Sequence, residues 1–225
     1  MIKCNGGVNM YRGCIFDLDG TLLDTVASIA HSANEAMACF GWRSNPVENY
    51  KGYAGDGQIE MLRRSLYDAG DIQGKDLDKV LTEYTQRFEK GCLYKVVPYP
   101  GILELLEELK KRKIKIGVLS NKEHHNVIYM IETIFGKNYF DMVLGQKPSH
   151  EKKPSPQGVR LLLKGFGITS EECLYIGDTN TDMKTGKGAG LYTIGVTWGF
   201  REEEELRREK ADAIISHPME IVKFL

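Results

Sequence analysis

The strongest constraint on the fold is an alternation of short apolar runs with segments whose apolar residues recur at helical spacing. After Pro100, and again after Pro156, apolar residues recur three, four and seven positions apart, as on one face of a helix. Strands alternating with helices favour an α/β fold, in which helices cover both faces of a parallel sheet. The runs expected to be strands are 13–16, 114–119, 142–144, 173–176, 192–196 and, at an edge, 213–215.

The alternation is interrupted between residues 25 and 94, where only helical patterns occur. Two long apolar stripes begin at Ile29 and Leu77, and a shorter one begins at Ile59 behind the loop 52–57. Helices inserted after the first strand predict a separate small helical domain, residues 25–94, on a core of residues 1–24 and 95–225. Hinges are expected near residues 24–25 and in the proline-containing segment 95–101.

Charge and composition exclude several classes of protein. Thirty Lys and Arg residues against 31 Asp and Glu leave a net charge of −1, which argues against a nucleic-acid partner. No apolar run approaches the ~18 residues that cross a bilayer, and the first residues lack the apolar core of a secretion signal. The five scattered cysteines resemble neither a disulfide framework nor a zinc knuckle. A cytoplasmic protein, monomeric or homodimeric, is expected.

Polar residues stand where the expected strands end, and in an open parallel sheet ligands bind outside these carboxyl ends. Converging carboxylates repel one another unless a cation neutralises them, and a few hard oxygen ligands suit Mg²⁺. Together with a lysine, the ion would also offset the charge of a bound phosphate. The residues of this candidate site are Asp17, Asp19, Ser120, Lys153, Asp178 and Asp182.

This set suggests phosphoryl transfer. Asp17 is placed to attack phosphorus and hold a covalent acyl phosphate. Asp19, if the chain bends at Gly20, would protonate the leaving oxygen and later deprotonate the attacking water. Ser120 and neighbouring amides would hold phosphate oxygens. Taken singly, Ser120 is better explained as a helix cap and Lys153 as an exposed lysine. Taken together, the candidate residues favour a site, because chance would not place every piece after a strand in this order.

Four segments resemble the four motifs of the haloacid dehalogenase superfamily of phosphohydrolases, in family order. They are FDLDGT at 16–21, LSNK at 119–122, KPSP at 153–156 and GDTNTD at 177–182. The resemblance runs from Tyr11 to Leu225, and the first nine residues, outside it, are expected to be a frayed tail.

The resemblance implies a Rossmann-like core with an inserted helical cap. It implies Asp17 as the nucleophile, Asp19 as the acid and base, and Mg²⁺ held by Asp17, Asp178 and the main-chain oxygen of Asp19. The chain would then be a Mg²⁺-dependent phosphatase that acts on a small phosphorylated metabolite through a phosphoaspartate.

The resemblance also implies which residues bind the transferred group. Ser120, Asn121 and Lys153 would bind the phosphoryl group, while Asp182 would support Lys153 or metal-bound water rather than bind the metal itself.

Within the superfamily, the segments DLDGTLLDT at 17–25 and GVTWG at 195–199 look most like phosphoglycolate phosphatases. The cap should then read the rest of the substrate. An arginine at position 63 or 64 would pair with a substrate carboxylate, although a solvated helix arginine explains either residue equally well. Further candidates are Lys51 and the loop 55–57.

Other functions remain open at this level. A phosphomutase of the β-phosphoglucomutase type and a pyrophosphatase use the same scaffold, and a signalling receiver or a non-catalytic binding protein fits less well.

Adjacent side chains on a helix point about 100° apart, so His124 and His125 are not expected to chelate one ion. Trp198 and Phe200 are expected to pack as loop anchors.

Overall fold

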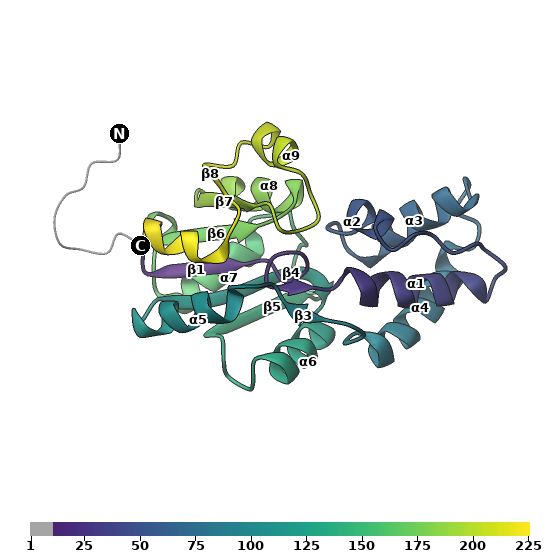
Figure 1. Ribbon diagram of the computed structural model, residues 1–225, viewed down its shortest axis with the longest axis horizontal. Coiled ribbons are helices and arrows are strands. Elements are labelled where there is room, and N and C mark those ends of the chain that lie inside the picture. Colours follow the sequence, from purple (N-terminus) through teal and green to yellow (C-terminus); the bar gives the residue numbers. More distant parts are fainter. Residues whose placement is uncertain (1–10) are drawn as a thin grey trace.

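The computed structural model describes residues 11–225, so the expected frayed tail lies outside the described residues. Six parallel strands form one sheet in the order β5–β4–β1–β6–β7–β8, which confirms the α/β, Rossmann-like fold (Figure 1). The strands are β1 Gly13–Phe16, β4 Lys115–Glu123, β5 Met142–Gln146, β6 Cys173–Gly177, β7 Tyr192–Val196 and β8 Ala213–Ile215. All six predicted strands are present, and β4 runs past its predicted end at residue 119 to Glu123.

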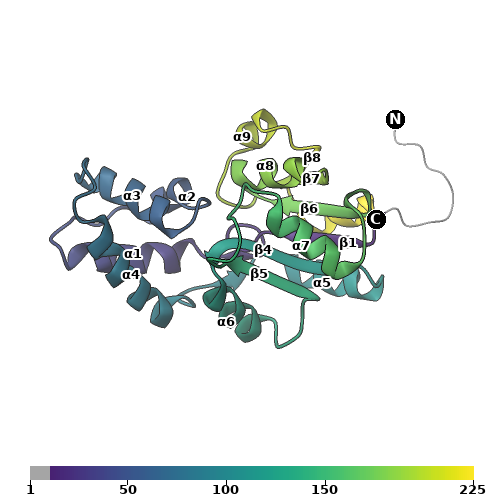
Figure 2. The same cartoon turned by 180° about the vertical axis from the view of Figure 1, so that it is seen from behind.

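Helices cover both faces of this sheet because successive strand residues point to opposite sides. In β1, Cys14 and Phe16 belong to one apolar cluster while Ile15 belongs to the other. The first face carries α5 Ile102–Lys111, α6 His124–Ile134 and the 3₁₀ segment η2 Pro218–Phe224 (Figure 1). The opposite face carries α7 Gln157–Phe166 and α8 Asn180–Gly188 (Figure 2). The shorter elements η1 Ser170–Glu172 and α9 Glu203–Arg208 complete this part.

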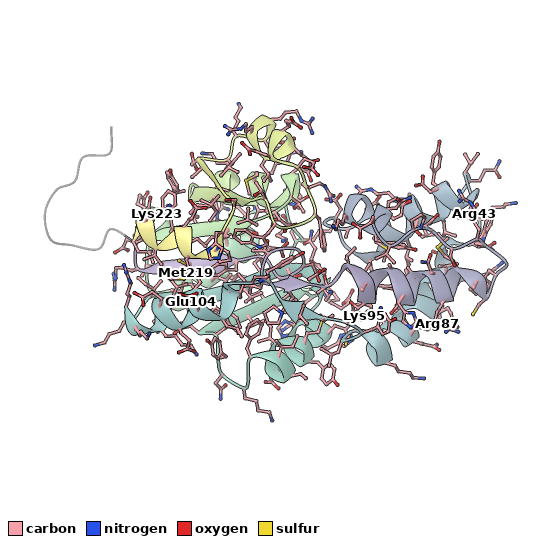
Figure 3. All side chains as sticks on the ribbon, in the orientation of Figure 1. Arg43, Arg87, Lys95, Glu104, Met219 and Lys223 are labelled. Carbon is pink, nitrogen blue, oxygen red and sulfur yellow. The ribbon has the colours of Figure 1, made fainter. Side chains whose placement is uncertain are left out.

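Residues 25–93 contain four helices and no strand, as the sequence predicts. They are α1 Val26–Ala38, α2 Asn49–Tyr53, α3 Gln58–Ala69 and α4 Leu77–Gly91. The stripes of α1 and α4 bury Ile29, Ala33 and Met37 on one helix and Val80, Tyr84 and Phe88 on the other. Arg87 of α4, labelled in Figure 3, also ion-pairs with Glu35 of α1 at 2.8 Å.

The short helix α2 differs from prediction, because it covers the beginning of a segment expected to be a loop. Its two tyrosines, Tyr50 and Tyr53, are buried in edge-to-face contact, with ring centroids 5.2 Å apart. Five residues are too few for a periodic apolar stripe, so this helix gave no signal in the sequence. Two residues of the predicted stripes, Phe40 at the end of the stripe that begins at Ile29 and Ile59 at the start of the shorter one, are exposed rather than buried.

Two chain segments connect the helical insertion, hereafter the cap, to the sheet. They are β2 Leu23–Asp24 and β3 Val97–Pro98, which pair antiparallel. Both expected hinges therefore coincide with this two-stranded link, with Lys95 beside it (Figure 3). The division into two domains at residues 24 and 95 stays a prediction.

Two further features concern the length of the helices and the cysteine thiols. Among residues 11–225, no helix combines the length and apolarity that crossing a bilayer requires. Cys14, Cys39, Cys92 and Cys173 are free thiols.

The packing of α7 gives a matched test of the fold. Leu162 is fully buried in the second apolar cluster, whereas its neighbour Leu161 is 42% exposed. Leu162→Ala should lower the free energy of unfolding by about 2–5 kcal/mol through lost burial and the cavity left behind. Leu161→Ala should cost less than about 1 kcal/mol. Urea unfolding followed by circular dichroism measures both, and equal losses would contradict the assigned face of α7.

Candidate active site

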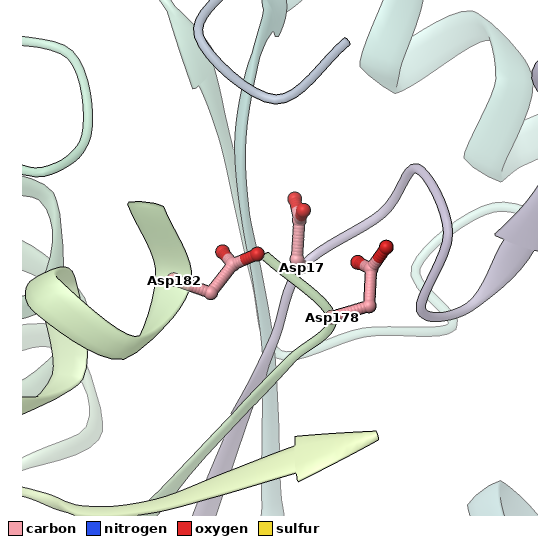
Figure 4. Close-up of side chains that lie close together, drawn as sticks. All are labelled: Asp17, Asp178 and Asp182. Carbon is pink, nitrogen blue, oxygen red and sulfur yellow. The ribbon is translucent and has the colours of Figure 1, made fainter. Parts of the chain in front are cut away.

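Three carboxylates converge at the carboxyl ends of β1 and β6. Asp17 follows β1, Asp178 follows β6, and Asp182 lies in the first turn of α8 (Figure 4). One carboxylate oxygen from each lies within 4.8 Å of the others, and all three residues are buried. They meet because β1 and β6 are parallel neighbours, so their ends open on the same edge of the sheet.

Lys153 neutralises part of this cluster. Its Nζ lies 2.8 Å from Asp17 Oδ1 and 2.7 Å from Asp182 Oδ1, and the side chain is buried. Asp182 is fixed in turn, because it accepts hydrogen bonds from the Tyr175 hydroxyl and the Thr179 hydroxyl and N–H. This arrangement agrees with the sequence expectation that Asp182 supports Lys153.

The cluster carries more negative than positive charge. Three carboxylates and one ammonium leave a formal excess of two negative charges. Burial and the repulsion of Asp182 raise the pKa of Asp17 well above its usual range, and the same two causes raise the pKa of Asp178 to about 7. Burial alone would lower the pKa of Lys153, but the two carboxylates outweigh it and raise that pKa. A divalent cation held by oxygen ligands would balance the excess, so the residues fit Mg²⁺.

Asp178 is held in place by two loops. The Thr21 hydroxyl and the Phe200 N–H each donate to it at 2.8 Å. Gly20 adopts a φ of +83°, and a Cβ there would lie 2.1 Å from Asp178 Oδ2, so only glycine fits. The Trp198 indole N–H donates to the Thr21 carbonyl at 3.0 Å, which confirms Trp198 as a loop anchor.

Asp19 has other partners than the three clustered carboxylates. Its Oδ1 accepts from the Thr25 hydroxyl at 2.6 Å and lies 2.5 Å from Lys122 Nζ. There it lines a small pocket of about 50 Å³ between the core and the cap. The pocket is lined by Asp17, Asp19, Ile29, Ala54, Gly55, Gly57, Gln58, Met61, Tyr84, Phe88, Ser120, Asn121, Lys122, Glu123 and Asn126.

Ser120 and Asn121 lie where the pairing of β4 with β5 becomes irregular, beyond Leu119. Ser120 is buried at the pocket, and its Oγ accepts from the Lys122 N–H at 3.2 Å. The Asn121 side chain donates to the carbonyls of Gly55 and Lys153 at 3.1 Å each, and it accepts from the Lys153 N–H at 2.7 Å. This side chain links the cap to the Lys153 loop, and the role of Asn121 in binding phosphate stays a prediction.

The core holds residues 51–57 of the cap, hereafter the cap segment. Arg201 of the core donates to the main-chain carbonyls of Lys51 and Ala54, the latter at 2.7 Å. Asp56 of the cap segment accepts from the Thr181 hydroxyl at 2.5 Å, and its carbonyl accepts from Lys152 Nζ at 3.0 Å. These contacts close the cap over the carboxylate cluster.

The cap cations expected to read the substrate lie outside the pocket. Arg63 pairs with Glu60 and is half exposed. Arg64 is bound to Asp56 at 2.5 Å and to the Tyr53 carbonyl, and Lys51 pairs with Glu48 at 2.8 Å. None of the three lines the pocket, so the structure does not bring these candidates together with Asp17 and Asp19.

The pocket's cation is instead Lys122, to which sequence reasoning gave no role. Lys122 lies two residues beyond Ser120 on β4, and strand residues two apart share a face. The spacing of two residues from Ser120 could therefore have indicated that Lys122 reaches the same site. The neighbouring histidines are structural, as expected: His124 Nδ1 accepts from the Gly145 N–H at 3.1 Å, and His125 is exposed beside Glu89.

The family model described as "Haloacid dehalogenase-like hydrolase" matches residues 14–196. The chain belongs to this family. It is 33% identical to a phosphoglycolate phosphatase of Aquifex aeolicus over 95% of this chain and 96% of that protein. It is also 29% identical to one of Photorhabdus laumondii, over 92% and 88%. The resemblance inferred from the motifs is confirmed.

Solved structures agree with this assignment. A protein classed as a phosphoglycolate phosphatase from Lactobacillus delbrueckii superposes with a TM-score of 0.88 at 30% identity, covering 94% of this chain and 97% of that one. CbbY of Rhodobacter sphaeroides, crystallised with phosphate, gives a TM-score of 0.76 at 26% identity, covering 94% and 96%. The chain is therefore a phosphatase of the phosphoglycolate phosphatase-like subfamily.

The contact between Arg201 and the cap segment predicts a measurable change in cap dynamics. Arg201→Met removes the donors to the carbonyls of Lys51 and Ala54, and about 10-fold faster amide hydrogen exchange in residues 52–57 is expected. Arg207→Met is the control, because Arg207 pairs only with Glu203 of its own helix among the described residues. Unchanged exchange in Arg201→Met would show that this contact does not hold the cap closed.

Proposed function

We propose that the protein is a Mg²⁺-dependent phosphatase that hydrolyses a small phosphorylated metabolite, phosphoglycolate foremost, through a phosphoaspartate on Asp17. The observation that carries this proposal is the shared pocket. Asp17, fixed by Lys153, and Asp19, fixed by Thr25 and Lys122, line the same small cavity but are held by different partners. One carboxylate is thus free for attack on phosphorus while the other serves proton transfer.

In the first step, a carboxylate oxygen of Asp17 attacks phosphorus and the bond to the ester oxygen breaks. Lys153 Nζ, 2.8 Å from the nucleophile, and the Ser120 hydroxyl stabilise the phosphoryl oxygens as charge spreads over them. Protonated Asp19 gives its proton to the leaving oxygen, so an alcohol departs rather than an alkoxide.

In the second step, water attacks the phosphorus of the acyl phosphate. Asp19, now a carboxylate, removes a proton from this water, and Asp17 leaves as a free carboxylate with release of inorganic phosphate. The hydrogen bond from Thr25 and the contact with Lys122 keep Asp19 oriented for both transfers.

Asp17, Asp178 and the main-chain oxygen of Asp19 would hold Mg²⁺, since Asp182 is already engaged by Lys153, Tyr175 and Thr179. The ion supplies positive charge that lets the dianionic phosphate approach the buried carboxylates. The charge excess of the cluster supports this assignment.

The size of the pocket supports a small leaving group. The pocket is small, in keeping with the short glycolate of phosphoglycolate, the substrate named for the relatives. Substrate entry then requires the cap to open at the two-stranded link. A cytoplasmic location and a monomeric or homodimeric state complete the proposal.

Activity on a panel of phosphate esters tests the chemistry. Wild-type enzyme with Mg²⁺ should release phosphate in proportion to the phosphoglycolate consumed, and EDTA should abolish the release. Asp17→Asn should lower kcat at least ~10³-fold, because the amide is not a competent nucleophile. Asp78→Asn, on the exposed side of α4, is the matched control.

Two outcomes would contradict the proposal. Wild-type activity in Asp17→Asn would remove Asp17 as the nucleophile. An isomerised phosphate ester formed without release of phosphate would identify a mutase.

Thermal unfolding tests the metal site without any substrate. At about 100 times its dissociation constant, Mg²⁺ should stabilise the wild-type protein by about 2.7 kcal/mol, which raises Tm by roughly 5–11 °C. Asp178→Asn should lose most of this rise, because it removes one ligand and part of the charge excess. An equal Mg²⁺-induced rise in both proteins would place the ion elsewhere.

A further inference from the structure

Lys122 is the one cationic residue among the described residues that line the pocket. Its side chain is 8% exposed, and its Nζ lies 4.9 Å from the centre of the Phe88 ring and 2.5 Å from Asp19 Oδ1. Much of the surrounding wall is apolar, formed by Ile29, Met61, Tyr84 and Phe88. A positive charge is therefore kept in a largely apolar compartment beside the acid and base.

The contacts of Lys122 leave part of its binding capacity unused. An ammonium group offers three hydrogen-bond donors. Within residues 11–225, Asp19 is the one acceptor within hydrogen-bond distance of Nζ, and Asp19 also accepts from Thr25. Donors of a buried cation are costly to leave without acceptors, so a ligand with acceptor atoms suits this position.

Asn126 provides a second, independent observation. It lies in the first turn of α6, lines the same pocket and is 4% exposed. Its side-chain amide has no hydrogen-bond partner in the part of the chain that the structure describes. The positive end of the α6 dipole adds to the preference of this position for an anion.

We propose that Lys122 and Asn126 form the subsite that binds the carboxylate of the leaving group. This inference rests on the proposed function and adds the residues and charge that select the substrate. Asp19 must reach the ester oxygen, and Lys122 Nζ lies 2.5 Å from Asp19. The anionic group must therefore lie within a bond or two of that oxygen, as the carboxylate of a 2-phosphorylated acid does.

Lys122 also has a simpler possible role, which is to position Asp19 alone. Such a role would affect the proton transfers of every substrate alike and would appear in kcat. A carboxylate subsite would affect carboxylated substrates selectively and would appear mainly in KM. The two roles are separable with a matched pair of esters.

The matched pair is phosphoglycolate and 2-hydroxyethyl phosphate, which have the same chain length but carry a carboxylate and a hydroxyl respectively. Wild-type enzyme should prefer phosphoglycolate in kcat/KM. Lys122→Met should reduce this preference about 10- to 100-fold through KM, as the loss of a hydrogen bond to a charged group predicts. Asn126→Leu should reduce it about 5-fold, and Lys122→Arg should retain most of it.

Lys51→Met is the control lysine variant, because Lys51 lies on the cap outside the pocket and pairs with Glu48. Its preference between the two esters should equal that of the wild type. Equal losses for both esters in Lys122→Met, or a wild-type enzyme without preference for phosphoglycolate, would overturn the carboxylate subsite while leaving the phosphatase intact.

Binding of sodium glycolate, measured by isothermal titration calorimetry with Mg²⁺ present, tests the subsite without catalysis. The dissociation constant should rise at least 10-fold in Lys122→Met relative to wild type and Lys51→Met. Failure of the wild type to bind glycolate, or equal binding by all three, would overturn the inference. Failure of the wild type to hydrolyse any ester while this binding pattern holds would instead overturn the proposed function alone.

Discussion

The ion pairs of Lys153 with Asp17 and Asp182 are the interaction on which the rest of the site depends. A buried ammonium without a partner, or three buried carboxylates without a cation, would each oppose folding. The parallel sheet makes the arrangement possible, because β1 and β6 end side by side and present Asp17 and Asp178 to the same space. The remaining excess of negative charge suits a divalent cation and, with it, a phosphate.

A second pair, Asp19 with Lys122, lies in the same pocket as Asp17 but is held by different partners. Asp17, bound by Lys153, and Ser120 lie on the side of the core, where we propose that the phosphoryl group is transferred. Asp19 and Lys122 stand on the side of the cap, beside the apolar residues of α1, α3 and α4. In the proposed mechanism, the residues of the core carry the phosphoryl transfer, and those near the cap select the leaving group.

The cap is held to the core through main-chain carbonyls as well as side chains. Arg201 binds the carbonyls of Lys51 and Ala54, and Asn121 binds that of Gly55. Asn121 also binds the loop that carries Lys153. One amide side chain therefore contacts both the cap and the loop that carries Lys153.

The sequence alone determined the six strands, the helical insertion and the carboxylates at the strand ends, because apolar periodicity and motif spacing are local properties of the chain. The close approach of Asp17, Asp178 and Asp182 follows from those local properties once the strands are parallel. The helix α2 was not predicted, because a helix of five residues is too short to show a periodic apolar pattern.

The tertiary structure alone decided which cation enters the pocket. Arg63, Arg64 and Lys51 are all cap cations, yet each is bound by a neighbour, while Lys122 of β4 reaches Asp19. The partners of Asn121 and Arg201 were likewise decided by the fold, because they lie on segments far apart in the sequence. Long polar side chains have many rotamers, and only the packed neighbours select the one that carries function.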